Sequence, residues 1–178
     1  MLKKILLGLA VALALFIIIV ATRPAAFQVT RSISVATPPE TVFAQVNDFH
    51  HWGAWNPWGK LDPAMKQSYE GPAAGAGAVY SWVGNNQVGE GKMTILQSQP
   101  NERIRIQLDF HKPLAGTSLA EFTFKPEGEK TTVSWSMSGK NNFIAIAMGL
   151  FMNVDKMIGD QFEKGLADLK SIAERRTQ

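Results

Sequence analysis

The pattern that most constrains the fold is a series of short segments with alternating apolar and polar residues, followed by one long segment with helical period. Such alternation indicates a strand with one buried face, and it is cleanest over Arg103–His111. Strands are also predicted over Phe27–Val35, Met65–Glu70, Ala78–Val83, Val88–Gln97, Leu119–Lys125 and Thr131–Ser138. Apolar residues then recur at steps of three and four from Phe143 to Arg176, which predicts one long helix. We therefore expect an α+β domain in which a curled antiparallel sheet of about seven strands wraps around this C-terminal helix.

Two short helical pieces are expected between the first two strands. Thr37-Pro38-Pro39-Glu40 matches a capping box, with Thr37 as the N-cap and Pro38 at the first helical position. The next segment, Asp48–Gly59, is too rich in Gly, Pro and Trp for a regular helix. It predicts a broken helical turn and a loop.

An unbroken apolar run from Ile5 to Ala21 precedes the first strand. Extended back to Leu2, it is long enough to cross a hydrocarbon core of ~30 Å as a helix. A cleavable signal peptide shares this pattern, but its apolar core is usually only ~7–15 residues long. No clean small-x-small cleavage site follows the run. We therefore expect residues 1–26 to form an uncleaved single-pass transmembrane anchor with a short linker, and residues 27–178 to form the folded domain.

The basic residues at the N-terminus bear on topology and partners. Lys3 and Lys4 favour a cytoplasmic N-terminus, which puts the body on the extracytoplasmic side, although Arg23 and Arg31 beyond the apolar run weaken this assignment. The net charge of +3 is fully accounted for by Lys3, Lys4 and Arg23, so the body from Phe27 onward is neutral. A neutral body without a basic run gives no reason to expect nucleic-acid binding.

Several kinds of chemistry are excluded or unsupported. The chain has no cysteine, which excludes disulfides, thiolate metal sites and a cysteine nucleophile. His50 and His51 are adjacent and must diverge, and His111 falls on the outer register of its strand, so no metal site is expected. No glycine-rich dinucleotide fingerprint and no inward pair of acids is present. We therefore expect no cofactor.

Motifs along the body give a more specific indication. They are Thr37-Pro38-Pro39-Glu40-Thr41-Val42-Phe43, Trp52-x-x-Trp55-Asn56-Pro57-Trp58, Gly89-Glu90-Gly91 with Met93-Thr94-Ile95, Val133–Gly139 and Gly159–Leu166. With these motifs the chain resembles, over Phe27–Gln178, the SRPBCC superfamily of START-like or birch-pollen-allergen proteins, and most closely its polyketide cyclase/dehydrase group. The resemblance implies a helix-grip fold, which hosts lipid carriers, ligand sensors and cyclases.

Inward-facing aromatic residues and methionines are the candidate ligand site, because they would line a cavity between the sheet and the long helix. The candidates are Trp55, Trp58, Tyr80, Trp82, Met93, Ile106, Phe110, Phe122, Phe124, Trp135, Met137, Phe151 and Met152. The same side chains could instead form a filled core. Arg31, the only charged residue on an inward register, is expected at the pocket mouth, where it could orient a carboxylate or phosphate.

The tryptophan-rich segment allows three interpretations. Trp52, Trp55 and Trp58 could form a wall of an apolar pocket or a wedge that touches the bilayer. They could equally plug the end of the sheet and pack the short helices there. The sequence leaves these alternatives open.

The leading functional hypothesis is a membrane-anchored module that binds a hydrophobic small molecule or lipid by burial. A polyketide cyclase/dehydrase-like enzyme is the first alternative, but such chemistry needs a polar group aimed into the pocket, and only Arg31, Tyr80 and His50 are candidates. A ligand-free structural or interaction domain with a filled core is the second alternative. The sequence favours binding over catalysis.

Overall fold

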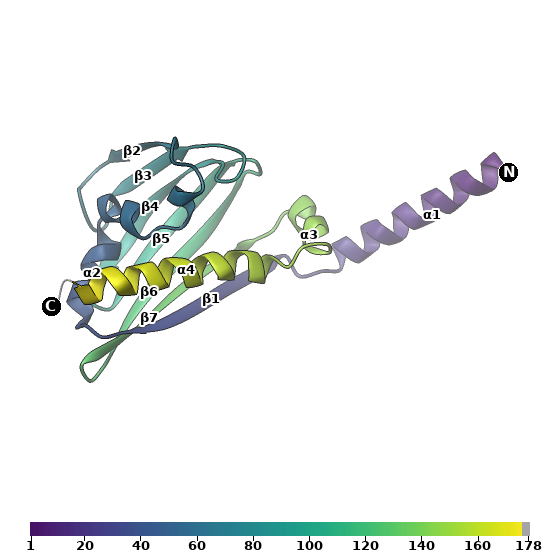
Figure 1. Cartoon of the computed structure of the whole chain (residues 1–178). Helices are drawn as coiled ribbons and strands as arrows, with labels where there is room; N and C mark the ends of the chain where they lie inside the picture. The colour runs from purple at the N-terminus through teal and green to yellow at the C-terminus, as the bar shows by residue number, and fades with distance from the viewer. Residues whose placement is uncertain (176–178) are drawn as a thin grey trace.

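Seven antiparallel strands form one curved sheet in the computed structural model, which describes residues 1–175 (Figure 1). They are β1 (Ala26–Val35), β2 (Lys66–Glu70), β3 (Val79–Val83), β4 (Glu90–Gln99), β5 (Arg103–Lys112), β6 (Gly116–Glu127) and β7 (Lys130–Lys140). Their order is β1-β7-β6-β5-β4-β3-β2, so β2 to β7 form a meander and β1 adds to β7. The predicted α+β class and curled sheet are confirmed.

One long helix, α4 (Val154–Arg175), lies along the concave face of the sheet (Figure 1). Its inner face buries Phe162, Leu166 and Leu169, which follow one another at steps of four and three and therefore share one side of the helix. The short elements α2 (Pro39–Asn47), η1 (Phe49–Ala54) and η2 (Trp58–Lys60) lie between β1 and β2 in sequence. The predicted arrangement of a sheet around a C-terminal helix is confirmed.

The predicted single helix from Phe143 to Arg176 is wrong at its start. The structure has a separate α3 (Phe143–Gly149), a turn, and then α4. The Asn142 side chain accepts a hydrogen bond from the Ala145 amide, and Asn153 accepts one from the Lys156 amide, each at 2.9 Å. Each helix therefore begins at its own asparagine cap. Arg176, the predicted last residue, lies outside the described residues.

The predicted capping box at Thr37 is also wrong. Pro38 is the N-cap of α2, and Pro39 is its first residue, so the fixed backbone of proline starts the helix. The carbonyl of Thr37 instead accepts a hydrogen bond of 2.7 Å from the Thr131 hydroxyl on β7. Thr37 thus fastens the chain to the sheet just before α2 begins.

The half of the concave face farther from the N-terminal helix is filled. A 3-10 helix has three residues per turn, which puts Phe49, Trp52 and Trp55 on one face of η1 and its C-cap, and all three are buried. The indole nitrogens of Trp52 and Trp55 donate hydrogen bonds to the carbonyls of Val46 and Gln45. Trp55 therefore belongs to a plug that α2 and η1 form over the sheet, whereas Trp52 belongs to this plug and also lines the cavity described below.

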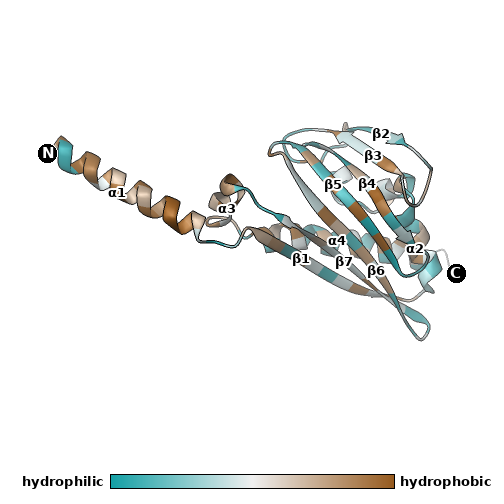
Figure 2. Cartoon of the chain, turned by 180° about the vertical axis from the view of Figure 1, so that it is seen from behind, coloured by the Kyte–Doolittle hydropathy of each residue, from teal (hydrophilic) through white to brown (hydrophobic). Residues whose placement is uncertain are grey.

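The N-terminal helix α1 (Leu2–Ala21) projects away from the sheet and is apolar along almost its whole length (Figure 2). Its twenty residues are long and apolar enough to cross a membrane, a test that a signal sequence also passes. Only the four residues Thr22–Ala25 separate it from β1. The body is therefore joined closely to the end of this helix.

Candidate functional site

A mostly apolar cavity of about 330 Å³ lies between the sheet and the first turns of α4. Seven of the candidate residues line it, and they come from η2, β3, β4, β5 and β7. They are Trp58, Tyr80, Trp82, Met93, Phe110, Trp135 and Met137. Residues that the sequence analysis did not single out also line it, among them Ala120 of β6 and Ile158 of α4. The volume is at the lower end of the range of about 300–1,000 Å³ typical of small-molecule sites.

Four other candidates lie in the filled half of the concave face and do not line this cavity. They are Trp55, Ile106, Phe122 and Phe124, and all four are buried. The Phe122 ring contacts Trp52 and Trp55 of η1 and its C-cap. The ring of Phe124, for example, packs edge-on against Phe43 of α2, with 5.4 Å between ring centroids. The inward register of Phe122 and Phe124 was predicted, but the short helices occupy the space in front of them.

The expected place of Phe151 and Met152 in the cavity wall is wrong. Both lie in the turn between α3 and α4 and are exposed, Phe151 to 81%. The physical reason is the break in the predicted helix, because the new cap at Asn153 starts α4 after these residues. Met148 and Met157, which share their helical period, are exposed as well.

Trp135 of β7 is the aromatic centre between the cavity and the plug. Its indole is stacked between Phe122 and Phe162, with centroid distances of 4.8 and 4.1 Å. The edges of Trp52 and Trp58 complete the cluster. Such a cage fixes the position of the indole by close packing on both faces.

Two glycines make room for these indoles. A Cβ on Gly165 of α4 would lie 2.9 Å from Cζ3 of Trp135, so the absence of a side chain lets α4 approach β7. A Cβ on Gly91 of β4 would lie 2.8 Å from the Trp82 ring and 2.5 Å from the Asp109 carbonyl oxygen. Both glycines lie within the motifs named above, but no local sequence pattern indicates their role. Their close approaches could be seen only after the strands and helix were placed.

The polar groups of the wall are few. The Tyr80 hydroxyl makes no hydrogen bond within residues 1–175, and burial, with a smaller effect from Tyr69 beside it, raises the pKa of Tyr80 to about 12. Tyr80 is therefore neutral at physiological pH and can donate a hydrogen bond. The Trp135 indole nitrogen is buried without a partner in the same described range. Nε1 lies on the edge of the indole opposite Cζ3, so this N–H is directed away from Gly165 and α4.

The cavity opens at the end of the sheet that carries the N-terminal helix. Four lining residues are also exposed: Asn86 and Gln87 of the β3–β4 turn, Lys112 at the end of β5, and Pro113 after it. The antiparallel register places these turns at the same end of the sheet as the start of β1. β1 starts beside the end of β7, and β7 ends beside the start of β6. β6 in turn starts beside the end of β5, and β5 ends beside the start of β4. Helices α1 and α3 lie on the same side (Figure 1).

Comparison with known proteins agrees with this architecture. The sequence pattern of the family described as "Polyketide cyclase / dehydrase and lipid transport" matches residues 26–174. The chain belongs to this family. The predicted relationship to the polyketide cyclase/dehydrase group is therefore confirmed.

Solved structures show the same fold at low sequence identity. A protein from Thermobifida fusca gives a TM-score of 0.63 at 21% identity, covering 83% of this chain and 93% of that one. A protein from Chromobacterium violaceum gives 0.60 at 18% identity, covering 85% and 99%. The Aha1 dimer from Colwellia psychrerythraea gives 0.60 at 14% identity, covering 83% and 96%. No curated protein sequence matches the chain.

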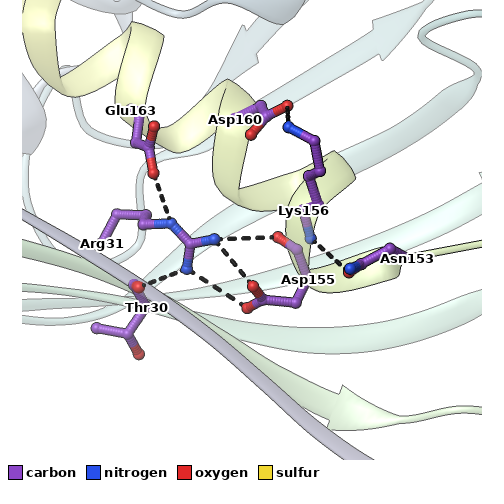
Figure 3. A network of polar contacts seen from close by, with 7 residues as sticks. All are labelled: Thr30, Arg31, Asn153, Asp155, Lys156, Asp160 and Glu163. Atoms are coloured by element: carbon purple, nitrogen blue, oxygen red, sulfur yellow. Dashed lines mark hydrogen bonds and ion pairs between the residues drawn. The ribbon is translucent and has the colours of Figure 1, made fainter.

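In this member of the polyketide cyclase/dehydrase and lipid transport family, the expected position of Arg31 at the pocket mouth is wrong. Its guanidinium lies against α4, where it pairs with Asp155 at 2.9 Å and with Glu163 at 2.8 Å (Figure 3). A Cβ on Gly159 would collide with this guanidinium, so the glycine leaves space for it. Arg31 thus fastens the edge strand β1 to α4 and is already saturated by carboxylates.

The Arg31 ion pairs give a prediction for the dependence of stability on pH. The guanidinium, mainly through its hydrogen bond, holds the pKa of Asp155 below its usual range. A carboxyl group whose pKa is lowered by folding stabilises the fold above its ordinary pKa, and this contribution is lost as the pH falls through the lowered value. Arg31→Gln is therefore expected to lower the melting temperature slightly at neutral pH, less so in high salt, and not at all in acid.

Thermal melts at neutral pH and at an acid pH below the lowered pKa of Asp155 test this expectation. Lys66→Gln is the control, because it removes the same charge from an exposed position on β2 that has no ion pair among the described residues. An equal loss for Arg31→Gln at both pH values would show that the side chain acts through packing, not through its charge.

The histidines do not form a site in the described part of the chain. His50 pairs with Asp48 at 2.7 Å and stacks on Tyr69, while the His51 ring contacts the Ala44 carbonyl oxygen. No group of three or more metal-binding side chains is found within residues 1–175. The cavity of this family member is bounded by apolar groups, neutral polar groups and one exposed lysine.

Proposed function

We propose that the protein is a membrane-anchored module that holds a hydrophobic small molecule or part of a lipid in the cavity beside Trp135. The observation that carries the proposal is an apolar cavity that opens at the end of the sheet joined to α1. An apolar guest would gain about 25 cal/mol for each Å² removed from water, before the costs of ordering are subtracted. Membership of a family that includes lipid transport supports the same function.

The N-terminal helix is the anchor in this proposal. We infer that α1 is retained and spans the bilayer with Lys3 and Lys4 on the cytoplasmic side, so that residues 27–178 form a domain on the extracytoplasmic side. The cavity mouth then faces the bilayer that holds α1. A hydrophobic guest could enter without crossing a long aqueous path.

The neutral Tyr80 hydroxyl in the wall suits a guest with one hydrogen-bond acceptor. The Tyr80 hydroxyl makes no hydrogen bond to the protein within residues 1–175, so an acceptor on the guest would satisfy it. A fatty acyl group with a carbonyl or hydroxyl meets this requirement. Lys112 at the mouth is exposed and pairs with Glu90 at 2.9 Å, so the guest does not need a negative charge.

Native mass spectrometry of the full chain, purified from its host membranes, tests the proposal. We expect one lipid-sized mass to remain bound per chain, and a fluorescent fatty acid to compete with it. Absence of both would favour a domain with no ligand. Analysis of the N-terminus in the same spectra shows whether α1 is retained, which tests the anchor separately.

A cyclase- or dehydrase-type enzyme is the second candidate, and the Tyr80 hydroxyl in the cavity wall is the observation that favours it. With a pKa of about 12, this phenol can donate a hydrogen bond to a developing enolate, but it cannot act as a base at neutral pH. Loss of turnover in Tyr80→Phe, with unchanged binding of a substrate, would favour the enzyme.

A further inference from the structure

The segment from Phe143 to Met152, which contains α3 and the following turn, is apolar in a way that the fold does not require. No charged residue occurs between Lys140 and Asp155. None of the α3 residues is buried, so the segment adds nothing to the core. Five of its large apolar side chains are exposed: Phe143, Ile144, Met148, Phe151 and Met152. A contiguous exposed apolar surface of this kind marks a site of interaction with a protein or a membrane.

The contacts of this segment identify the partner. Its turn packs against α1, where the rings of Phe151 and Phe16 are stacked with 6.5 Å between their centroids. Figure 2 shows α3 and α1 as neighbouring apolar elements at the same end of the molecule. The exposed surface is therefore continuous with the side of a helix that is itself apolar enough to lie in lipid.

The depth of the contact follows from helix geometry. Twenty residues at 1.5 Å each give α1 a length of about 30 Å, which equals the thickness of the hydrocarbon core. If Ala21 lies at the body-side boundary of this core, Phe16 lies ~7–8 Å below it. The ring of Phe151 lies beside Phe16, so it also lies below the point at which the chain leaves the hydrocarbon.

We propose that residues 143–152 insert into the leaflet next to α1 and form a second, interfacial contact with the lipid surface. An apolar segment buried ~5–10 Å at the acyl boundary is the arrangement expected for such an element. Two contacts fix both the orientation of the domain and its distance from the bilayer. They hold the cavity mouth against the lipid surface. The inference rests on the anchor and carrier functions proposed above and adds the way in which the cavity meets its source of lipid.

Site-directed fluorescence in the full chain tests the insertion. The chain has no cysteine, so Phe151→Cys and Ile144→Cys each give one labelling site, and both side chains are exposed enough to be replaced without loss of the fold. Each variant is labelled with an environment-sensitive dye and reconstituted in phosphatidylcholine vesicles. We expect blue-shifted emission that is quenched by lipids carrying a spin label near the headgroup. Glu129→Cys, in the exposed β6–β7 turn at the opposite end of the sheet, is the control and should stay in water.

Each outcome decides the proposal. Unshifted emission at both sites would show that the segment stays in water. A blue shift without quenching would show that a protein or a second copy of the chain covers it. Either result overturns the insertion. Native mass spectrometry separates this result from the carrier function. A retained lipid without quenching contradicts only the insertion, whereas quenching without a retained lipid contradicts only the carrier.

Discussion

Ala120→Phe is expected to weaken the binding of a fluorescent fatty acid by about 5- to 150-fold, because overpacking a filled site costs about 1–3 kcal/mol. Ala120 lies on β6, where it is buried and contributes to the cavity wall between Ile106 and Met137 on the neighbouring strands. The new ring would enter space that is empty in the protein without a ligand. The melting temperature should therefore stay the same while the affinity for the fatty acid falls. Fluorescence titration and thermal melts of the same samples check both expectations.

The control for this variant is Thr123→Phe, which adds a ring to the opposite face of the same strand. Thr123 is only half-buried and does not line the cavity. It should leave the affinity unchanged. If Ala120→Phe also left the affinity unchanged, the bound molecule would have to lie outside this cavity.

Trp55→Ala is expected to destabilise the domain by about 3–5 kcal/mol, the usual cost of removing a large buried aromatic side chain. Trp55 is fully buried and packs against Trp52, Phe122 and Trp135 at centroid distances of 4.6, 6.0 and 5.7 Å. Its loss would also leave the Gln45 carbonyl oxygen without its indole donor. For a chain of this size, the expected fall in melting temperature is roughly 6–20 °C.

Trp58→Ala is the matched comparison, because Trp58 is only half-buried and lines the cavity. We expect a smaller loss of stability and a weaker affinity for the fatty acid. A loss of stability as large as that of Trp55→Ala, with unchanged affinity, would assign Trp58 to the core as well. Chemical denaturation and ligand titration of both variants distinguish the two roles.

The sheet could be predicted because strand side chains alternate between two faces. On β5 the buried Ile104 and Ile106 lie between the half-buried Arg103, Arg105 and Gln107, and this local pattern is visible in the sequence. The break before α4 was missed because Phe151 continues the apolar period of the following helix. That period indicates which residues share a face, but not whether any other element packs against it. Asn153, followed by an apolar periodic segment, was the available signal for a new helix start.

The candidate site could be predicted only as a face of the sheet. Phe122 and Trp135 share that face, yet the first lies under the plug and the second borders the cavity. The difference depends on how far η1 reaches into the concave side, which is a property of the assembled fold. Arg31 had the predicted inward register, but its partners lie more than a hundred residues away on α4, where no local pattern could indicate them.

The connection between α1 and β1 limits what such a protein can deliver. Four extended residues reach no more than about 14 Å, and β1 is paired with β7 from its first residue, so little slack exists. If α1 spans a bilayer as proposed, the domain diffuses only laterally and does not carry a bound molecule to a distant membrane. In the proposed carrier function, an acceptor would then have to come to the domain, either as a soluble protein or as a neighbour in the same bilayer. The rate of transfer would depend on the concentration of that acceptor.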